Sequence, residues 1–278
     1  MRYVVPVDPA VPMHLHHIPT DVPAGLHREE AEARTEALGG ELGDLADLLF
    51  AAGAHGLLVV LQGLDTSGKD GTIRHLLRYI NAQSCRVVPF KVPTELELSH
   101  DFLWRVHQQV PGRGSIAIFN RSHYEDVLVV RVRGLAPEHV WRGRYDHINA
   151  FEALLTDSDV LIAKFYLHIS PEEQERRLLE REAEVEKSWK LNVEDWKDRA
   201  LWDEFRQAYE EALRRCSTPR APSYVVPADH KWYRNLAVTD ALVELLRPHK
   251  RAWLDRLEHI GIAARKEIEE YRRSLQTP

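Results

Sequence analysis

The chain has 278 residues, 44% of them hydrophobic, which suits one α/β domain with insertions and a sizeable buried core. Its 37 Lys and Arg residues against 43 Asp and Glu residues give a formal net charge of −6, which counts against a nucleic-acid-binding protein. Any polyanionic ligand must therefore meet basic side chains that are gathered locally. Two isolated cysteines, a start without a signal-peptide stretch and no long uncharged apolar window predict a reduced, cytoplasmic protein without a membrane partner.

Apolar runs alternate with helix-like segments along the chain. Residues 1 to about 25, with several prolines and histidines, predict an arm or loop, and residues 26–52 predict a helix that could break at Gly39-Gly40. We expect buried strands at 57–61, 86–90, 115–119, 160–169 and 224–226. We expect helices at 72–79, 100–109, 137–155, 171–186 and 231–246. This alternation predicts a parallel sheet that is covered on both faces.

We divide the chain into three parts: residues 1–55 pack on a core, residues 56–250 form that core, and residues 251–278 form a C-terminal helix. The helix after Ile169 has a clear start, with Ser170 as N-cap, Pro171 at the first position and Glu173 closing a capping box. Residues 180–199 are dense in charge and predict a helical excursion from the sheet. The tryptophans at 189, 196 and 202 fit either a lid or ordinary core anchors.

A phosphate-binding loop is predicted at residues 63–69. The sequence Gly-Leu-Asp-Thr-Ser-Gly-Lys follows an apolar strand and precedes a helix, the order that points backbone N–H groups at phosphates. Lys69 is expected to reach phosphate oxygens, while the loop and helix start supply the remaining contacts. The predicted phosphate and nucleotide contacts there are Gly63, Thr66, Ser67, Gly68, Asp70, Gly71 and Thr72.

Two acidic residues make this loop unusual. Asp70 stands where nucleotide hydrolases place the Ser or Thr that holds Mg²⁺. Asp65 lies inside the loop, where a carboxylate is repelled by phosphate unless a divalent cation lies between them. We therefore expect Asp65 to bind Mg²⁺ or to position the acceptor, with a turn-stabilising role as the alternative.

A second polar segment ends the strand at 115–119. Asn120 stands where a Walker B strand usually ends in Asp, and Glu125 and Asp126 can restore the missing charge at a metal. The alternative is that these two acids cap the next helix. Arg121 is suited to clamp a phosphate oxygen, because its guanidinium is planar and always charged. Arg131 and Arg133 either extend this basic track or lie on a solvated face.

At these residues the sequence resembles the second family of polyphosphate kinases. The resemblance covers about residues 20–245. It rests on GLDTSGKDGT (63–72), PFKVPT (89–94), SHDFLWR (99–105), FNRSHYEDVL (119–128), YLHISPEEQ (166–174) and PADHKWYR (227–234).

The resemblance implies a P-loop kinase fold like that of thymidylate kinases, with a five-stranded parallel sheet flanked by helices and a helical lid at about 175–200. It implies Mg²⁺- or Mn²⁺-dependent transfer between inorganic polyphosphate and nucleotides, by a dimer or tetramer. Asp65, Lys69 and Arg121 match catalytic or phosphate-binding positions, Glu125 matches enzymes that phosphorylate both AMP and ADP, and Lys91 lies in a matching block. The basic residues of this lid are candidates for contact with polyphosphate or nucleotide, without an individual role assigned to any: Lys187, Lys190, Lys197 and Arg199.

Taken together, these residues predict phosphoryl transfer between polyphosphate and AMP or ADP, with guanine nucleotides as further acceptors. The predicted catalytic residues are Asp65, Lys69, Arg121, Glu125 and Asp126, and the predicted metal ligands are Asp65, Asn120, Glu125 and Asp126. An ATP-dependent nucleotide kinase and a non-catalytic nucleotide sensor remain as alternatives. His14, His16 and His17 have no carboxylate or cysteine in their loop, so a solvated or packing role is expected there.

Overall fold

The structure is a computed structural model that describes residues 3–275; the side chains of Lys187 and Lys190 lie outside the described residues. The strands are β1 (Val5–Pro6), β2 (Gly56–Gln62), β3 (Cys85–Pro89), β4 (Ile116–Asn120), β5 (Val160–His168) and β6 (Ser223–Pro227). The α-helices are α1 (Arg28–Ala52), α2 (Lys69–Leu76), α3 (Glu95–Leu98), α4 (Trp104–His107), α5 (Val129–Val132), α6 (Glu138–Asp157), α7 (Pro171–Ala183), α8 (Val193–Ala200), α9 (Trp202–Cys216), α10 (Lys231–Leu246) and α11 (Lys250–Ser274). The 3-10 helices are η1 (Leu15–His17), η2 (His123–Asp126), η3 (Val185–Lys190) and η4 (Arg247–His249).

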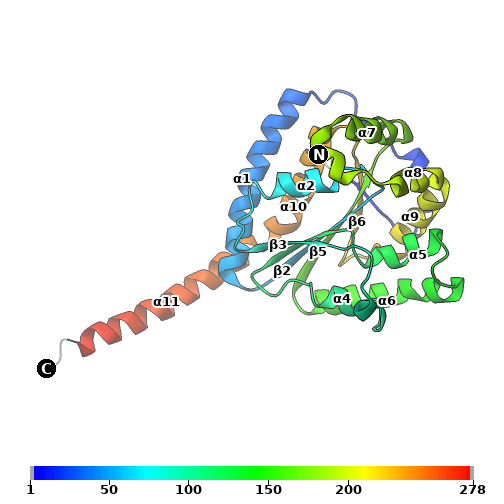
Figure 1. The fold of residues 1–278 in the computed structure, drawn as a ribbon. Coiled ribbons are helices and arrows are strands. Elements are labelled where there is room, and N and C mark those ends of the chain that lie inside the picture. The colour runs from blue at the N-terminus through cyan, green and yellow to red at the C-terminus, as the bar shows by residue number, and fades with distance from the viewer. Residues whose placement is uncertain (1–2, 276–278) are drawn as a thin grey trace.

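One sheet runs through the domain in the order β1-β6-β5-β2-β4-β3 (Figure 1). All five expected strands are present and parallel, which confirms the predicted α/β fold. The sixth strand, β1, adds antiparallel to β6 through Val5 and Pro6. A strand of two residues is too short to show an alternating pattern, so β1 could not be predicted from the sequence.

Helices cover both faces of this sheet. Strand β2 is buried along its whole length because it lies between β5 and β4. Its residues alternate between two apolar clusters, as the period of a strand requires. Leu57 and Leu61 pack with residues of α1, α2 and α10, whereas Leu58 and Val60 pack with residues of α6 and α9. The sheet is therefore the middle of three layers.

Helix α1 does not break at Gly39-Gly40, contrary to the expectation from sequence. It is continuous over Arg28–Ala52, and Gly39 lies directly against the ring of Tyr79. A Cβ atom at Gly39 would lie 2.3 Å from Tyr79 Cε1, so the missing side chain allows close packing. The glycine serves contact between elements and costs the helix only about 1 kcal/mol relative to alanine.

The predicted start of α7 is only partly correct. Ser170 caps the helix by accepting a hydrogen bond from the Glu173 backbone N–H at 3.1 Å, and Pro171 opens it. The reciprocal contact is absent, because the Ser170 N–H donates to Asp229 Oδ1 at 2.8 Å. The Glu173 carboxylate instead accepts from Arg176 and Arg177. The helix expected at 100–109 is likewise reduced to Trp104–His107.

The C-terminal helix α11 begins against the domain and then leaves it. Trp253 is fully buried, but most residues after Leu257 are exposed, and Figure 1 shows α11 projecting alone from the base of α1. Among residues 3–275, no helix has the length and apolar character needed to cross a bilayer.

Candidate active site

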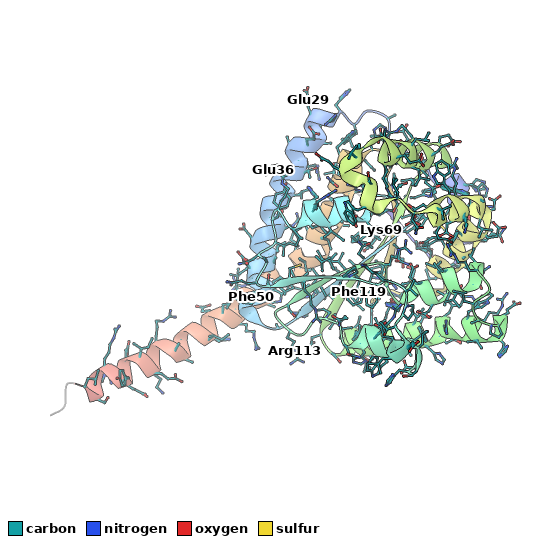
Figure 2. All side chains as sticks on the ribbon, viewed as in Figure 1. Glu29, Glu36, Phe50, Lys69, Arg113 and Phe119 are labelled. Carbon is teal, nitrogen blue, oxygen red and sulfur yellow. The ribbon has the colours of Figure 1, made fainter. Side chains whose placement is uncertain are left out.

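The predicted phosphate-binding loop lies at the carboxyl end of the central strand β2. It turns there into α2, and Figure 2 places Lys69 near the centre of the domain, where α2 begins. Gly68, the N-cap of α2, has a φ of 104°, a left-handed conformation that suits glycine. A Cβ atom at Gly68 would lie 1.9 Å from Arg234 Nη1, so only glycine fits between the loop and this buried arginine. The helix N-terminus and loop amides form the predicted anion site.

The other predicted loop residues shape this turn. Thr66 has a φ of 64°, which is uncommon for a residue with a side chain, and Gly63 has a φ of 148°. Ser67 and Thr72 are fully buried, and the Thr72 hydroxyl donates to the Gly68 carbonyl at 3.2 Å. Gly71 faces Arg234, like Gly68. These residues set the loop backbone, whose amides are the groups available to phosphate.

Lys69 is folded onto its own loop. Its ammonium donates to the carbonyl oxygens of Gly63 at 2.6 Å and Leu64 at 3.1 Å, and the residue is 8% exposed. Burial and, after it, the charge of Arg121 lower the pKa of Lys69 to about 8, despite nearby carboxylates. The ammonium is therefore held at the loop. Because its pKa is only about 8, it begins to lose its proton just above neutral pH.

Arg121 brings two predicted carboxylates together. Its guanidinium donates to Asp65 Oδ1 at 2.7 Å and to Glu125 Oε2 at 3.4 Å, while Gln62 Nε2 donates to Glu125 Oε1 at 3.1 Å. Burial raises the pKa of Asp65, but the charges of Lys69 and Arg121 outweigh this effect, so the pKa is lowered. Both acids are thus ordered beside the ammonium.

The backbone of Arg121 is itself strained into this position. Its φ is 63°, and Thr66 is the other non-glycine residue of this site with a positive φ. The Arg121 N–H donates to the Leu61 carbonyl at 3.0 Å, which ties the end of β4 to the end of β2. Such conformations persist where the surroundings fix them, and they cluster at functional sites.

Asn120 and Asp70 also meet. Asn120 Nδ2 donates to Asp70 Oδ1 at 2.9 Å, although the two residues belong to β4 and α2. The strand end and the residue after the lysine therefore form one polar edge near Lys69. Oxygen donors of this kind suit Mg²⁺ or Mn²⁺.

Comparisons with known proteins agree with this geometry. The family model for polyphosphate kinase 2 matches residues 25–252. The chain belongs to the polyphosphate kinase 2 family. It is 55% identical over 202 residues to an AMP/ADP-polyphosphate phosphotransferase from Meiothermus ruber, covering 73% of this chain and 76% of that protein.

Two further relatives of this polyphosphate kinase extend the match. An ADP-polyphosphate phosphotransferase from Rhodopseudomonas palustris is 41% identical over 246 residues, covering 84% of each chain. The crystal structure of polyphosphate kinase 2 from Arthrobacter aurescens TC1 superposes with a TM-score of 0.84 at 38% identity, covering 88% of each chain. The predicted family and fold are therefore confirmed.

Four residues predicted from the sequence lie outside this cluster. Asp126 is paired with Arg144 at 3.0 Å, and its role as a metal ligand stays a prediction. Arg131 pairs with Glu211 at 2.6 Å, Arg133 pairs with residues of α8, and Lys91 is exposed. Their proposed contacts with phosphate would require the arginines to leave these partners.

The segment predicted as a lid forms α7, η3 and α8 in the structure, and its role as a lid stays a prediction. Asp195 of α8 pairs with Arg181 of α7 at 2.6 Å, and Asp198 pairs with Arg133 at 2.6 Å. Burial first and then the nearby charge of Asp65 raise the pKa of Asp195, so the lid acid lies close to the loop acid. These pairs join α8 to α7 and to Arg133, while Gln174 and Arg177 of α7 bond to the backbone of Asp65 and Thr66 in the loop.

The three tryptophans at 189, 196 and 202 differ in their surroundings. Trp189 is 80% exposed, whereas Trp196 Nε1 donates to Glu182 Oε1 at 2.8 Å within the lid. Trp202 packs against both apolar clusters of the domain, as a core anchor does.

A buried polar network lies beneath the segment that carries Glu125. Lys164 of β5 donates to Glu152 of α6, to the Tyr124 hydroxyl at 3.1 Å and to the Cys216 carbonyl at 2.6 Å. Tyr124 donates to Glu152 at 2.9 Å, and His123 Nε2 lies 3.3 Å from the same carboxylate. Burial raises the pKa of Glu152, but Lys164 and His123 outweigh it, so the pKa is lowered. This network therefore holds His123 and Tyr124 of η2 in place.

The sequence analysis missed two buried arginines that support the loop. Arg177 donates to the Thr66 carbonyl at 2.9 Å and to the Ala228 carbonyl at 2.7 Å. Arg234 fills the space at Gly68, and burial together with Arg177 and Arg74 lowers its pKa to about 10. The one available signal was that Arg234 ends the block PADHKWYR.

Proposed function

We propose that this polyphosphate kinase transfers phosphoryl groups between inorganic polyphosphate and nucleoside mono- and diphosphates. The observation that carries this proposal is the arrangement of Arg121, Asp65 and Glu125 beside Lys69 at the carboxyl end of β2. Phosphoryl transfer passes through a loose transition state, so positioning and charge neutralisation supply most of the catalysis. An acceptor phosphate is already ionised and needs no strong general base.

In this mechanism each charged group has a separate task. The loop amides and Lys69 hold the transferring phosphate, and Lys69 must leave the carbonyls of Gly63 and Leu64 to reach it. Arg121 offsets charge on the phosphate oxygens. Asp65 and Glu125 keep Arg121 in place until the ligand binds, because both accept its hydrogen bonds.

We propose that Mg²⁺ or Mn²⁺ supports this reaction. Asp65, Glu125, Asp70 and Asn120 supply carboxylate and amide oxygens around the loop, a donor set that fits these ions. We keep Asp126 as a further candidate ligand, since its pair with Arg144 is like the pair of Asp65 with Arg121. When bound, the ion would neutralise charge on the phosphates and shield them from Asp65.

We propose that AMP is accepted as well as ADP, with guanine nucleotides as further acceptors. Glu125 matches the family position associated with use of both adenine acceptors, and it is held by Gln62 and Arg121 at the loop. The Meiothermus ruber relative is named for AMP and ADP, whereas the Rhodopseudomonas palustris relative is named for ADP alone. The higher identity to the first supports acceptance of AMP.

A donor–acceptor matrix tests this function. The purified full chain is given polyphosphate or ATP as the only donor, and AMP, ADP, GMP or GDP as the acceptor. We expect ATP from polyphosphate and ADP without added ATP, and ADP from polyphosphate and AMP. Transfer from ATP but not from polyphosphate would favour an ATP-dependent kinase, and binding without any transfer would favour a sensor.

We also propose that the protein acts in the cytoplasm as a homo-oligomer, a dimer or tetramer, built through α11. The exposed part of this helix carries apolar residues at a 3-4-4 spacing, which keeps them on one face of a nearly straight helix. They are Leu257, Ile260, Ala264, Ile268, Tyr271 and Leu275. The same face begins at Trp253 in the core and continues without a covering partner in the described chain, which supports a second copy as the occupant.

Light scattering after size-exclusion chromatography tests this assembly. We expect Ile260→Glu with Ile268→Glu to lower the mass, because both changes place charge on the shared face. Ile262→Glu is the matched control, since Ile262 is also exposed but lies off the 3-4-4 stripe. An unchanged mass in the double variant would contradict this interface.

A further inference from the structure

Three histidines of the N-terminal segment lie together beside helix α9. The rings of His14, His16 and His17 are separated by 3.9 to 5.7 Å between centroids. The sequence favoured a solvated or packing role here because the loop has no carboxylate. The fold supplies one, since Glu210 of α9 lies against the same cluster.

The ligand atoms of His14, His16 and Glu210 all lie within 4.8 Å of one another. Within the described residues 3–275, no other group of three His, Cys, Asp or Glu residues gathers its ligand atoms this closely. The cluster shares no residue with the P-loop or with the segment 120–126. It is therefore separate in composition from the phosphotransfer site.

The backbone between the two histidines is fixed without any metal. Leu15 is fully buried, its N–H donates to Glu210 Oε1 at 2.8 Å, and its carbonyl accepts from His168 Nε2 at 3.0 Å. These contacts hold the turn against α9 and β5. His14 and His16 flank Leu15 with exposed rings, so the rings can rotate while their backbone stays in place.

We propose that His14, His16 and Glu210 bind one transition-metal dication of the Zn²⁺ type, with water completing the coordination. Two imidazoles and one carboxylate form a donor set typical of Zn²⁺, whereas Mg²⁺ prefers oxygen ligands alone. Tetrahedral bonds of about 2.1 Å place neighbouring ligand atoms roughly 3.4 Å apart. The exposed rings reach this spacing by small side-chain rotations.

The positive charge of Arg206 lies beside this site and disfavours a bound cation, so a substitution of Arg206 tests the proposal. Its Nη1 donates to Glu210 Oε1 at 3.1 Å, and its Nη2 donates to Asp203 Oδ1 at 3.1 Å. This guanidinium repels a bound dication. When the guanidinium turns away from Glu210, it keeps Asp203 as its hydrogen-bond partner. Arg206→Gln should therefore bind the metal more tightly than the unchanged chain.

Zn²⁺ binding to the full chain, without any histidine tag, tests the proposal. Affinity is measured by competition with a chromophoric chelator in millimolar Mg²⁺, which occupies sites made of oxygen ligands. We expect one Zn²⁺ per chain, binding at least tenfold weaker in His14→Ala with His16→Ala, and several-fold tighter in Arg206→Gln. Glu210→Gln keeps an acceptor for the Leu15 N–H but should also weaken binding. His139→Ala, at an exposed histidine of α6, is the control and should bind like the unchanged chain.

Two further readouts separate a metal site from a structural effect. Co²⁺ should give the visible absorption of a tetrahedral ion with nitrogen ligands, and the double variant should lose it. Zn²⁺ should raise the melting temperature of the unchanged chain but not of the double variant, because the ion ties residues 14–16 to α9. Equal Zn²⁺ affinity in the double variant, or loss of the ion in Asp65→Asn instead, would overturn the proposal.

Discussion

Two clusters of charged side chains meet in one short segment of this protein and differ in their access to solvent. Arg121 and Glu125 face the P-loop and remain 37% and 16% exposed, whereas the ion pair of Lys164 and Glu152 beneath them is 4% and 1% exposed. The upper cluster consists of charges that a ligand can reach. The lower one consists of charges that already satisfy one another and hold His123 and Tyr124.

Charged side chains of one segment can therefore serve two different purposes, ligand binding and support of the fold. In the proposed mechanism, the charged side chains at the P-loop exchange their present partners for phosphate and metal. Buried charges cannot exchange partners, so their loss leaves an uncompensated ion. Substitutions in the upper cluster should therefore change catalysis more than stability, and substitutions in the lower cluster should do the reverse.

The largest effect is expected from Arg121→Ala. This change removes the guanidinium that joins Asp65 to Glu125 and that we propose offsets phosphate charge. Loss of one preorganised charge costs roughly 3–4 kcal/mol, or about 10²–10³ in rate. Steady-state kinetics with polyphosphate and ADP checks this, with Arg121→Lys as the matched variant that keeps the charge but not the fork. A rate within a few-fold of the unchanged enzyme would remove Arg121 from the mechanism.

Glu152→Gln should act mainly on stability. The substitution leaves Lys164 charged and buried without its counter-ion, which costs about 3–5 kcal/mol. Urea unfolding measures the loss, and the exposed pair of Glu138 and Arg142 on the same helix provides a control. Glu138→Gln should leave stability unchanged. Equal effects of the two variants would mean that the buried network does not support the segment.

The pH dependence of activity should expose the charge on Lys69. Its pKa is lowered to about 8, chiefly by burial and by Arg121, while Asp65, Glu125 and Asp70 act in the opposite direction. The ammonium is charged below this pKa and loses its proton as the pH rises through it. We therefore expect kcat/KM for polyphosphate to fall above about pH 8, by up to tenfold per pH unit. A flat profile to pH 10 would contradict this role.

Glu125→Asn is expected to have the smallest and most selective effect. The family resemblance ties Glu at this position to AMP use, and Gln62 and Arg121 hold its carboxylate at the loop. Turnover with AMP should fall more than turnover with ADP, which a comparison of the two acceptors at saturating polyphosphate measures. Equal losses on both would leave Glu125 without a part in acceptor choice.

Much of the fold could be predicted because its signals are local. Apolar runs marked all five parallel strands, and Gly63 to Lys69 marked the turn between β2 and α2. The errors arose where tertiary contacts decide the local structure. Tyr79 makes Gly39 a packing residue, and Asp229 takes the hydrogen bond that would have completed the capping box at Ser170.

The site was predictable in its loop and less so in its surroundings. The glycine–lysine spacing, read with the strand before it and the helix after it, predicted Lys69, and the conflict between a carboxylate and phosphate predicted a special role for Asp65. The support given by Arg177 cannot be seen in the sequence, because it arises from contacts between residues more than 100 positions apart. The same limit applied to Glu210, which reaches the N-terminal histidines only in the folded chain.

Lys69→Ala with polyphosphate as the only phosphoryl donor tests the central claim most directly. Transfer to AMP and ADP is measured beside the thermal unfolding of the same preparation. We predict that the variant stays folded while transfer to both acceptors falls by about 10²–10³, because the loop loses the ammonium that we propose meets the phosphate. Near-normal transfer by the folded variant would contradict the assignment of this loop as the site of phosphoryl transfer.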